Sequence, residues 1–210
     1  MIPVNKYGGV AARDRQQHRR ERFIAAGFKL FAATGYANTT IVALSEAANC
    51  ALRTFYEEFG SREALLGEMF DRVMAKVMQD TLDALQAAGN EPRDFVRAGV
   101  DAYVASMTAD AAAARVVLIE VIGVSRELDK RRRELMKSFV RNLQNVIAPT
   151  GRRAVALEDL DIVILALAGA TDELVTEWLL SKGRLPLDRL TSVLYDLWLR
   201  GLRLDAPRKL

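Results

Sequence analysis

The chain has 210 residues, half of them hydrophobic, with one cysteine, one histidine and a formal net charge of +3. A single cysteine excludes an internal disulfide, and the sequence has no Gly-rich phosphate loop, His-Glu-x-x-His motif or cysteine cluster, so it indicates neither an enzyme nor a metal or cofactor site. The most apolar run, residues 162–170, is about half as long as a membrane span requires, and we expect a cytoplasmic protein.

The helical spacing of apolar residues predicts an all-α chain of about nine helices, because no alternating pattern or hairpin turn indicates a strand. We expect helices over residues 13–34, 41–48, 52–58, 62–88, 93–107, 111–124, 126–147, 157–181 and 187–203. Residues 1–12, with Pro3, Gly8 and Gly9, are expected to form a disordered arm, and residues 205–210 a tail.

Positive charge gathers in the first part of the chain. Residues 1–62 contain 9 Lys and Arg against 5 Asp and Glu, whereas the remaining residues contain 21 against 22. This asymmetry favours a polyanionic partner for the N-terminal region, although a solvated basic segment would have the same composition.

Residues 41–59 have the dimensions of a helix-turn-helix, two short helices joined by a tight turn at residues 49–51. Phe55 and Phe59, four residues apart, are expected to face the core of a three-helix head. The opposite face of the second helix, with Leu52, Arg53 and Thr54, is suited to the major groove of DNA, which is wide enough to admit a helix.

Between residues 20 and 66 the sequence resembles the TetR (tetracycline-repressor-like) family of transcriptional regulators. The resemblance rests on many residues in the family's order and spacing: Arg20-Glu-Arg-Phe-Ile-Ala-Ala, Leu30-Phe31, Gly35-Tyr36, Thr39-Thr40, Ala47-Ala48, Thr54-Phe55-Tyr56, Phe59, Ser61-Arg62-Glu63 and Leu65-Leu66. It implies a DNA-binding domain over residues 13–62 and a ligand-binding and dimerisation domain over residues 63–204.

The resemblance also implies roles for individual residues. Thr40, Tyr56 and Arg62 would bind DNA phosphates, and Arg53 and Thr54 would lie nearest to base edges. The full set of expected DNA contacts is Arg13, Arg15, Arg19, Thr39, Thr40, Ala51, Leu52, Arg53, Thr54, Tyr56 and Arg62.

The sequence departs from the family pattern at two places. The turn usually reads Gly-Val-Ser, and here Ala51 removes the serine N-cap, at a cost of about 1 kcal/mol. Glu58 replaces a histidine and, with Glu57, is expected to place negative charge near the DNA. These departures leave open an alternative function, a helical small-molecule-binding protein with a weakened DNA-binding head.

For the C-terminal region the resemblance implies a homodimer formed by the last two long helices and a pocket for a small-molecule effector. Expected dimer contacts are Leu160, Ile164, Leu167, Thr171, Leu174, Trp178, Leu190, Leu194, Leu197 and Gly201. Expected ligand contacts are Phe70, Met74, Met78, Tyr103, Met107, Glu120, Phe139 and Trp178, although ordinary core packing would also explain the Met and aromatic residues. The expected function is repression of transcription from a near-palindromic operator, relieved by a largely apolar ligand.

Overall fold

The computed structural model of the chain describes residues 6–89, 91–147, 155–181 and 184–204. Within these residues it consists of nine α-helices and one short π-helix, η1, with no strand. The helices are α1 (Lys6–Thr34), α2 (Ile41–Ala47), α3 (Leu52–Glu58), α4 (Arg62–Ala87), α5 (Pro92–Thr108), α6 (Ala111–Arg115), η1 (Val116–Glu120), α7 (Arg126–Ile147), α8 (Leu157–Leu180) and α9 (Leu187–Gly201). The all-α fold expected from the sequence is confirmed.

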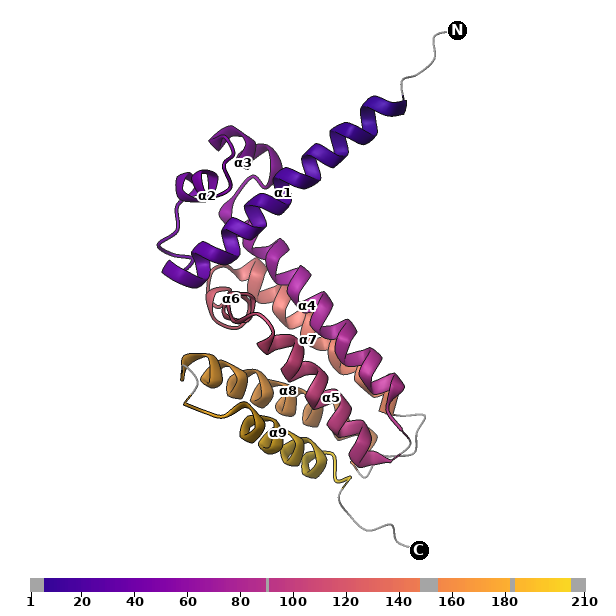
Figure 1. Ribbon diagram of the computed structural model, residues 1–210. Helices are drawn as coiled ribbons and strands as arrows, with labels where there is room; N and C mark the ends of the chain where they lie inside the picture. Colours follow the sequence, from indigo (N-terminus) through magenta and orange to yellow (C-terminus); the bar gives the residue numbers. More distant parts are fainter. Residues whose placement is uncertain (1–5, 90, 148–154, 182–183, 205–210) are drawn as a thin grey trace, which may run out of the picture.

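The helices form two parts joined by α4. Figure 1 shows α1, α2 and α3 gathered at one end, while α4 runs from this head into the second part beside α5 and α7. Helices α8 and α9 lie side by side on the other face of α5 and α7, and α5 packs against both α4 and α9. The head and the larger helical part are therefore connected by one continuous helix.

Two expectations about the helices are wrong. Helix α1 begins at Lys6, so residues 6–12 are helical and not part of a disordered arm; the glycines there weaken a helix by only about 1 kcal/mol each. The expected helix over residues 111–124 divides into α6 and η1, and the Val121 amide donates to Val116 O five residues earlier, at 3.1 Å. The remaining arm, residues 1–5, and the tail, residues 205–210, lie outside the described residues.

The head is built around aromatic side chains from α1 and α3. Phe23, Phe31 and Phe55 have no exposed surface, and the Phe23 ring lies edge-on to Phe55, with ring centroids 5.3 Å apart. Phe59 completes the cluster at 5.9 Å from Phe23. The inward orientation expected for Phe55 and Phe59 is thus confirmed, and it turns the other face of α3 to solvent.

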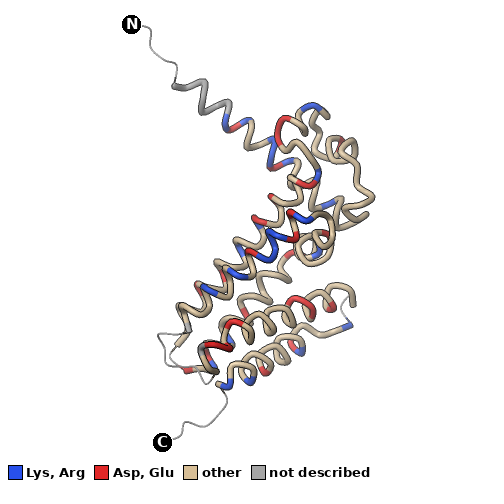
Figure 2. Tube along the Cα trace, turned by 180° about the vertical axis from the view of Figure 1, so that it is seen from behind, with Lys and Arg blue, Asp and Glu red and all other residues tan. Residues whose placement is uncertain are grey.

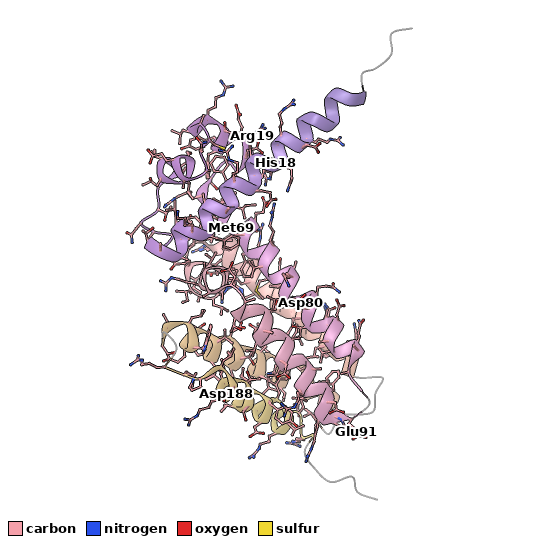
Figure 3. The ribbon with its side chains drawn as sticks, viewed as in Figure 1. His18, Arg19, Met69, Asp80, Glu91 and Asp188 are labelled. Atoms are coloured by element: carbon pink, nitrogen blue, oxygen red, sulfur yellow. The ribbon has the colours of Figure 1, made fainter. Side chains whose placement is uncertain are left out.

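Glu58 is a second point of contact between α1 and the end of α3. Its side chain is only 2% exposed and pairs with Arg19, with 2.9 Å between Arg19 Nη2 and Glu58 Oε1. Arg20 donates to the Glu58 carbonyl and also pairs with Glu68 of α4. Figure 3 shows Arg19 on α1 beside α3. The expectation that Glu58 places charge near DNA is therefore wrong, since its carboxylate is enclosed by arginines of the head itself.

Close approach of α1 and α4 fixes the head against the start of the larger part. Gly27 of α1 is buried against Met69 of α4, which Figure 3 labels where the two helices meet. A Cβ at Gly27 would lie 2.7 Å from the Met69 sulfur, closer than real side chains approach. Glycine is therefore needed here for helix packing.

No single described helix is both long and apolar enough to cross a membrane. One pair of successive segments, α5 with α6 and η1, meets the length and composition criteria together, but it is bent by 96°.

The Glu58 contacts give a prediction for stability. Glu58→Gln should lower the free energy of unfolding by about 2 kcal/mol, because two partly buried arginines lose their counterion. Glu57→Gln is the matched control: its pair with Arg53 is exposed, so the change should be no more than about 0.5 kcal/mol. Urea unfolding measures both, and equal losses would contradict the role assigned to Glu58.

Candidate nucleic-acid interface and internal cavity

Helix α3 has four exposed side chains, and three of them were expected to contact DNA. Leu52 is 44% exposed, Tyr56 is 53% exposed and the Arg53 side chain is 89% exposed. Thr54, one residue from Arg53, is half-buried. The structure thus brings together on one surface most of the residues expected from the sequence to face a DNA groove.

Glu57 forms an ion pair with Arg53 but leaves the Arg53 side chain exposed to solvent. The Arg53 Nε donates to Glu57 Oε1 at 2.7 Å, one helical turn along α3. Within the described residues, the two terminal nitrogens of Arg53 have no hydrogen-bond partner. The carboxylate that was expected only to repel DNA therefore also holds the guanidinium through Nε, and it leaves the two terminal nitrogens available to another acceptor.

The two short helices begin differently. Thr40 caps α2, since its Oγ1 accepts a hydrogen bond from the Ala43 amide at 3.1 Å, and its side chain stays exposed. Ala51 precedes α3 and forms no side-chain cap, because alanine has no side-chain oxygen that could accept a hydrogen bond. Asn49, in the turn between the helices, has a left-handed φ of 48°, a conformation that asparagine tolerates better than most residues.

Two expected DNA contacts are turned inward. Thr39 is only 2% exposed and donates its hydroxyl hydrogen to Gly35 O at 2.8 Å. Arg62 donates from Nη1 to Tyr36 O at 2.9 Å and also to Thr39 O, and its guanidinium lies 4.7 Å from the centre of the Tyr36 ring. Both assignments to DNA are therefore wrong for this structure, because these polar groups stabilise the loop between α1 and α2.

The three arginines of α1 that were expected to bind DNA divide into two groups. Arg13 and Arg15 are exposed on the part of α1 that extends past α2 and α3, where Figure 2 shows basic positions in blue. Arg19, by contrast, is paired with Glu58, with its Nε donating at 2.9 Å. Of these three arginines, Arg13 and Arg15 are fully available to a polyanion, and the expected role of Arg19 would require it to leave a buried carboxylate.

A cavity of about 400 Å³ lies in the larger part of the molecule and is lined by residues of α4, α5, η1, α7, α8 and α9. Five residues expected to bind a ligand line it: Phe70, Met74, Met78, Tyr103 and Phe139. Met107 is 1% exposed and packs into the core, and Trp178 does not reach the cavity wall, so these two expectations are wrong. Trp198 of α9 lines the cavity instead; it follows Leu190 and Leu194 at four-residue spacing, a signal that the sequence contained.

Glu120 was expected to bind ligand, but it points to the head. Its Oε2 accepts the backbone amide of Tyr36 at 2.8 Å, and its Oε1 lies 3.0 Å from Arg115. The side chain is 11% exposed. Two neighbours in η1, Val117 and Leu118, line the cavity. Glu120 therefore connects a cavity wall to the loop between α1 and α2, a long-range contact that no local sequence pattern indicated.

One polar pair lies within the mostly apolar cavity wall. The Tyr103 hydroxyl of α5 donates to Asp172 Oδ1 of α8. Burial raises the pKa of Asp172 above 3.8, against the lowering effects of the Tyr103 hydrogen bond and of the Arg132 charge. Burial and the Asp172 charge raise the pKa of Tyr103 well above its usual value, so the phenol keeps its proton and remains a donor.

The expected dimer surface is largely on the wrong face of α8 and α9. Leu160, Ile164, Leu167, Thr171, Leu190 and Leu194 are each less than 7% exposed within the single chain. Gly201 also faces inward, because a Cβ there would lie 2.8 Å from Leu167. The accessible apolar residues belong to the opposite faces, where Ile162, Leu165 and Val193 are 64%, 51% and 49% exposed. Leu174, Trp178 and Leu197 are half-buried, and their dimer contacts stay predictions.

Comparison with known protein families accounts for nearly all of the described chain. Residues 23–69 match the model described as bacterial regulatory proteins of the tetR family, and residues 70–201 match that of the C-terminal region of YsiA-like proteins. No curated protein sequence matches the chain.

Solved structures share the fold at low sequence identity. The fatty acid degradation regulator FadR from Bacillus halodurans is 22% identical with a TM-score of 0.76, over 88% of this chain and 96% of that one. FadR from Bacillus subtilis, in complex with stearoyl-CoA, is 18% identical with a TM-score of 0.74, over 86% and 98%. PfmR from Thermus thermophilus is 21% identical with a TM-score of 0.68, over 86% and 98%.

The fold, the exposed helix α3 and the matched family models all indicate a transcriptional regulator with an N-terminal helix-turn-helix. Transcription regulators of this kind are not enzymes, and their N-terminal helix-turn-helix is the DNA-binding part. The chain belongs to the TetR family of bacterial transcriptional regulators.

Proposed function

We propose that this protein represses transcription by binding a near-palindromic operator as a homodimer, and that a largely apolar small molecule in the cavity releases it from DNA. The observation that carries the proposal is the presence in one chain of an exposed α3 surface and, beyond the start of α4, a cavity of about 400 Å³. A cavity of this size and apolar lining is typical of a small-molecule site.

Base recognition is assigned to Arg53 and backbone recognition to Tyr56 and Thr40. The free terminal nitrogens of Arg53 have the geometry to donate to O6 and N7 of a guanine in the major groove. Tyr56 presents a hydroxyl suited to a phosphate oxygen. The alternative, a head too acidic to bind DNA, loses most of its support because Glu58 is enclosed by Arg19 and Arg20 and Glu57 is paired with Arg53.

For the ligand, we propose a long apolar chain with an acidic head. Most of the cavity wall is aliphatic or aromatic, and Arg132 and Arg133 of α7 also line it. Neither arginine forms an ion pair or hydrogen bond within the described residues, so both are available to an anionic group. The stearoyl-CoA complex of the structurally similar Bacillus subtilis FadR supports an acyl compound as the ligand class.

Release from DNA would require the ligand to prefer one orientation of the head. Two connections reach the head from the cavity: α4, which lines the cavity through Phe70 and Met74, and η1, whose Glu120 holds the Tyr36 amide. A ligand that binds more tightly when these elements are displaced would shift the two recognition helices of a dimer off their half-sites. Its effect on operator affinity equals its difference in affinity for the two states.

The proposed dimer uses the outward faces of α8 and α9. Ile162 and Leu165 project from α8 and Val193 from α9, so the apolar face that they form is accessible to a second copy of the chain. A twofold dimer through this face would present two copies of α3, and half-sites about 34–36 Å apart would match one turn of DNA.

The DNA-binding function is tested by incubating the purified full-length protein with sheared genomic DNA and sequencing the bound fragments at two salt concentrations. We expect enrichment of one near-palindromic sequence, with less DNA bound at the higher salt because phosphate contacts release counterions. Absence of any enrichment at low salt would contradict the proposal and favour a small-molecule-binding protein.

Substitutions on α3 should separate backbone contacts from base contacts. Tyr56→Phe should weaken binding to all fragments roughly tenfold, because only a phosphate hydrogen bond is lost. Arg53→Ala should instead relax the preference at one base pair of each half-site, where about 1–3 kcal/mol of discrimination disappears. Quantitative binding to a library of variant sites measures both effects.

The matched control for these variants is Arg97→Ala, which removes the same charge from an exposed position on α5. Its affinity and base preference should equal those of the unmodified protein. If Arg97→Ala weakens binding as much as Arg53→Ala, net charge rather than α3 accounts for the affinity.

The dimer surface gives a separate prediction. Replacing Ile162 and Leu165 together by Glu should shift the protein towards monomers in sedimentation analysis, because four charges would meet at the twofold axis of the proposed interface. Ala75→Glu, at an exposed position of α4, should leave the oligomeric state unchanged. An unmodified protein that is monomeric at micromolar concentration, or a double variant that remains dimeric, would overturn the assigned surface.

A further inference from the structure

Asp172 differs from the two threonines beside it on the cavity wall, Thr171 and Thr176, because one of its side-chain oxygens has no partner in the described part of the chain. Thr171 donates to Leu167 O and accepts from Trp198 Nε1 at 2.9 Å, and the Thr176 hydroxyl donates to the Asp172 carbonyl. The Asp172 carboxyl takes one hydrogen bond, from the Tyr103 hydroxyl to Oδ1. Within the described residues its Oδ2 has no hydrogen-bond partner.

The position of this oxygen makes the missing partner costly once an apolar ligand fills the cavity. Asp172 is half-buried on the cavity wall, among side chains such as Val100 and Ala168. Arg132 is near enough for its charge to act on Asp172, but it does not form an ion pair with it. Its Oδ2 is accessible from the cavity, so an apolar ligand that filled this space would remove water from the oxygen and leave it without a donor. A donor supplied by the ligand would remove this cost.

We propose that the ligand carries a hydroxyl group on its otherwise apolar chain, close to the acidic head, and that Asp172 Oδ2 accepts a hydrogen bond from it. The inference rests on the proposed function, in which the cavity binds a chain with an acidic head. The hydroxyl lies near the head because Arg132, one of the two arginines available to that head, acts on Asp172 directly.

An uncharged donor fits the surroundings better than a cation. The charged side chains on the cavity wall besides Asp172 are Arg132, Arg133 and Glu173, so an amine bound at Asp172 would lie in the repulsive field of Arg132. A hydroxyl donates to the carboxylate and also accepts from the protonated carboxyl, so it satisfies Asp172 in either state. A site built to bond a hydroxyl also discriminates strongly against the ligand that lacks it.

The test is a calorimetric titration of the purified full-length protein with four ligands of equal chain length: hexadecanoate, 3-hydroxyhexadecanoate, 16-hydroxyhexadecanoate and hexadecylamine. We expect 3-hydroxyhexadecanoate to bind roughly tenfold more tightly than hexadecanoate or 16-hydroxyhexadecanoate. The amine should bind more weakly than any of the acids. In Asp172→Leu the advantage of the 3-hydroxyl should disappear while hexadecanoate binds as well or better.

Tyr103→Phe provides a second variant if Asp172→Leu fails to fold. It removes the other donor to Asp172 and leaves the carboxyl in place, so the advantage of the 3-hydroxyl should persist or increase. If the advantage of the 3-hydroxyl came only from the general polarity of the cavity, it would persist in Asp172→Leu. That result would overturn the inference.

The remaining outcomes separate this inference from the function on which it rests. Equal binding of hexadecanoate and its 3-hydroxy derivative would refute the hydroxyl contact while leaving the acyl-binding cavity in place. Tightest binding of hexadecylamine would refute it in favour of a cationic ligand at Asp172. Binding of none of the four would contradict both the inference and the proposed ligand class, whereas enrichment of an operator from genomic DNA would still support the DNA-binding function.

Discussion

The backbone N–H and C=O of Tyr36 link the head of this protein to its larger part. The N–H donates to Glu120 of η1 at 2.8 Å, and the carbonyl accepts from Arg62 at the start of α4 at 2.9 Å. The Arg62 guanidinium also lies over the Tyr36 ring. Both partners belong to elements that continue into the walls of the cavity. The loop between α1 and α2 is therefore held by the two segments that a bound ligand would contact.

The head could be predicted from the sequence because its determinants are local. The spacing of Phe55 and Phe59, the cap at Thr40 and the breaks near Gly35 and Gly60 place three helices and expose one face of α3. The partners of Glu58 and Arg62 are 23 or more residues away in sequence, and a charge pattern alone does not distinguish a buried ion pair from a contact with DNA. The errors at Glu58 and Arg62 have this common cause, whereas the Thr39 hydroxyl is turned inward by a bond to Gly35, only four residues away.

The larger part was less predictable for a different reason. Helix α8 has apolar residues around most of its circumference, so its sequence does not say which side faces the core and which remains accessible. The split of residues 111–124 into α6 and η1 likewise has no local breaker until Gly123, whose φ is +71°. The i+5 hydrogen bonding of η1 sets the direction of Glu120, and this explains why its role was assigned to the cavity rather than to the head.

The central claim is that Glu120 fixes the orientation of the head relative to the cavity. It is tested most directly by electron spin resonance distances between labels on Leu52 of α3 and Gln86 near the end of α4, both exposed, in a Cys50→Ser background diluted with unlabelled protein. The account predicts one narrow distance distribution, which broadens or shifts in Glu120→Gln, because a neutral amide holds the Tyr36 amide less strongly. Identical narrow distributions in both proteins would show that α1 and α4 alone position the head, and would contradict the claim.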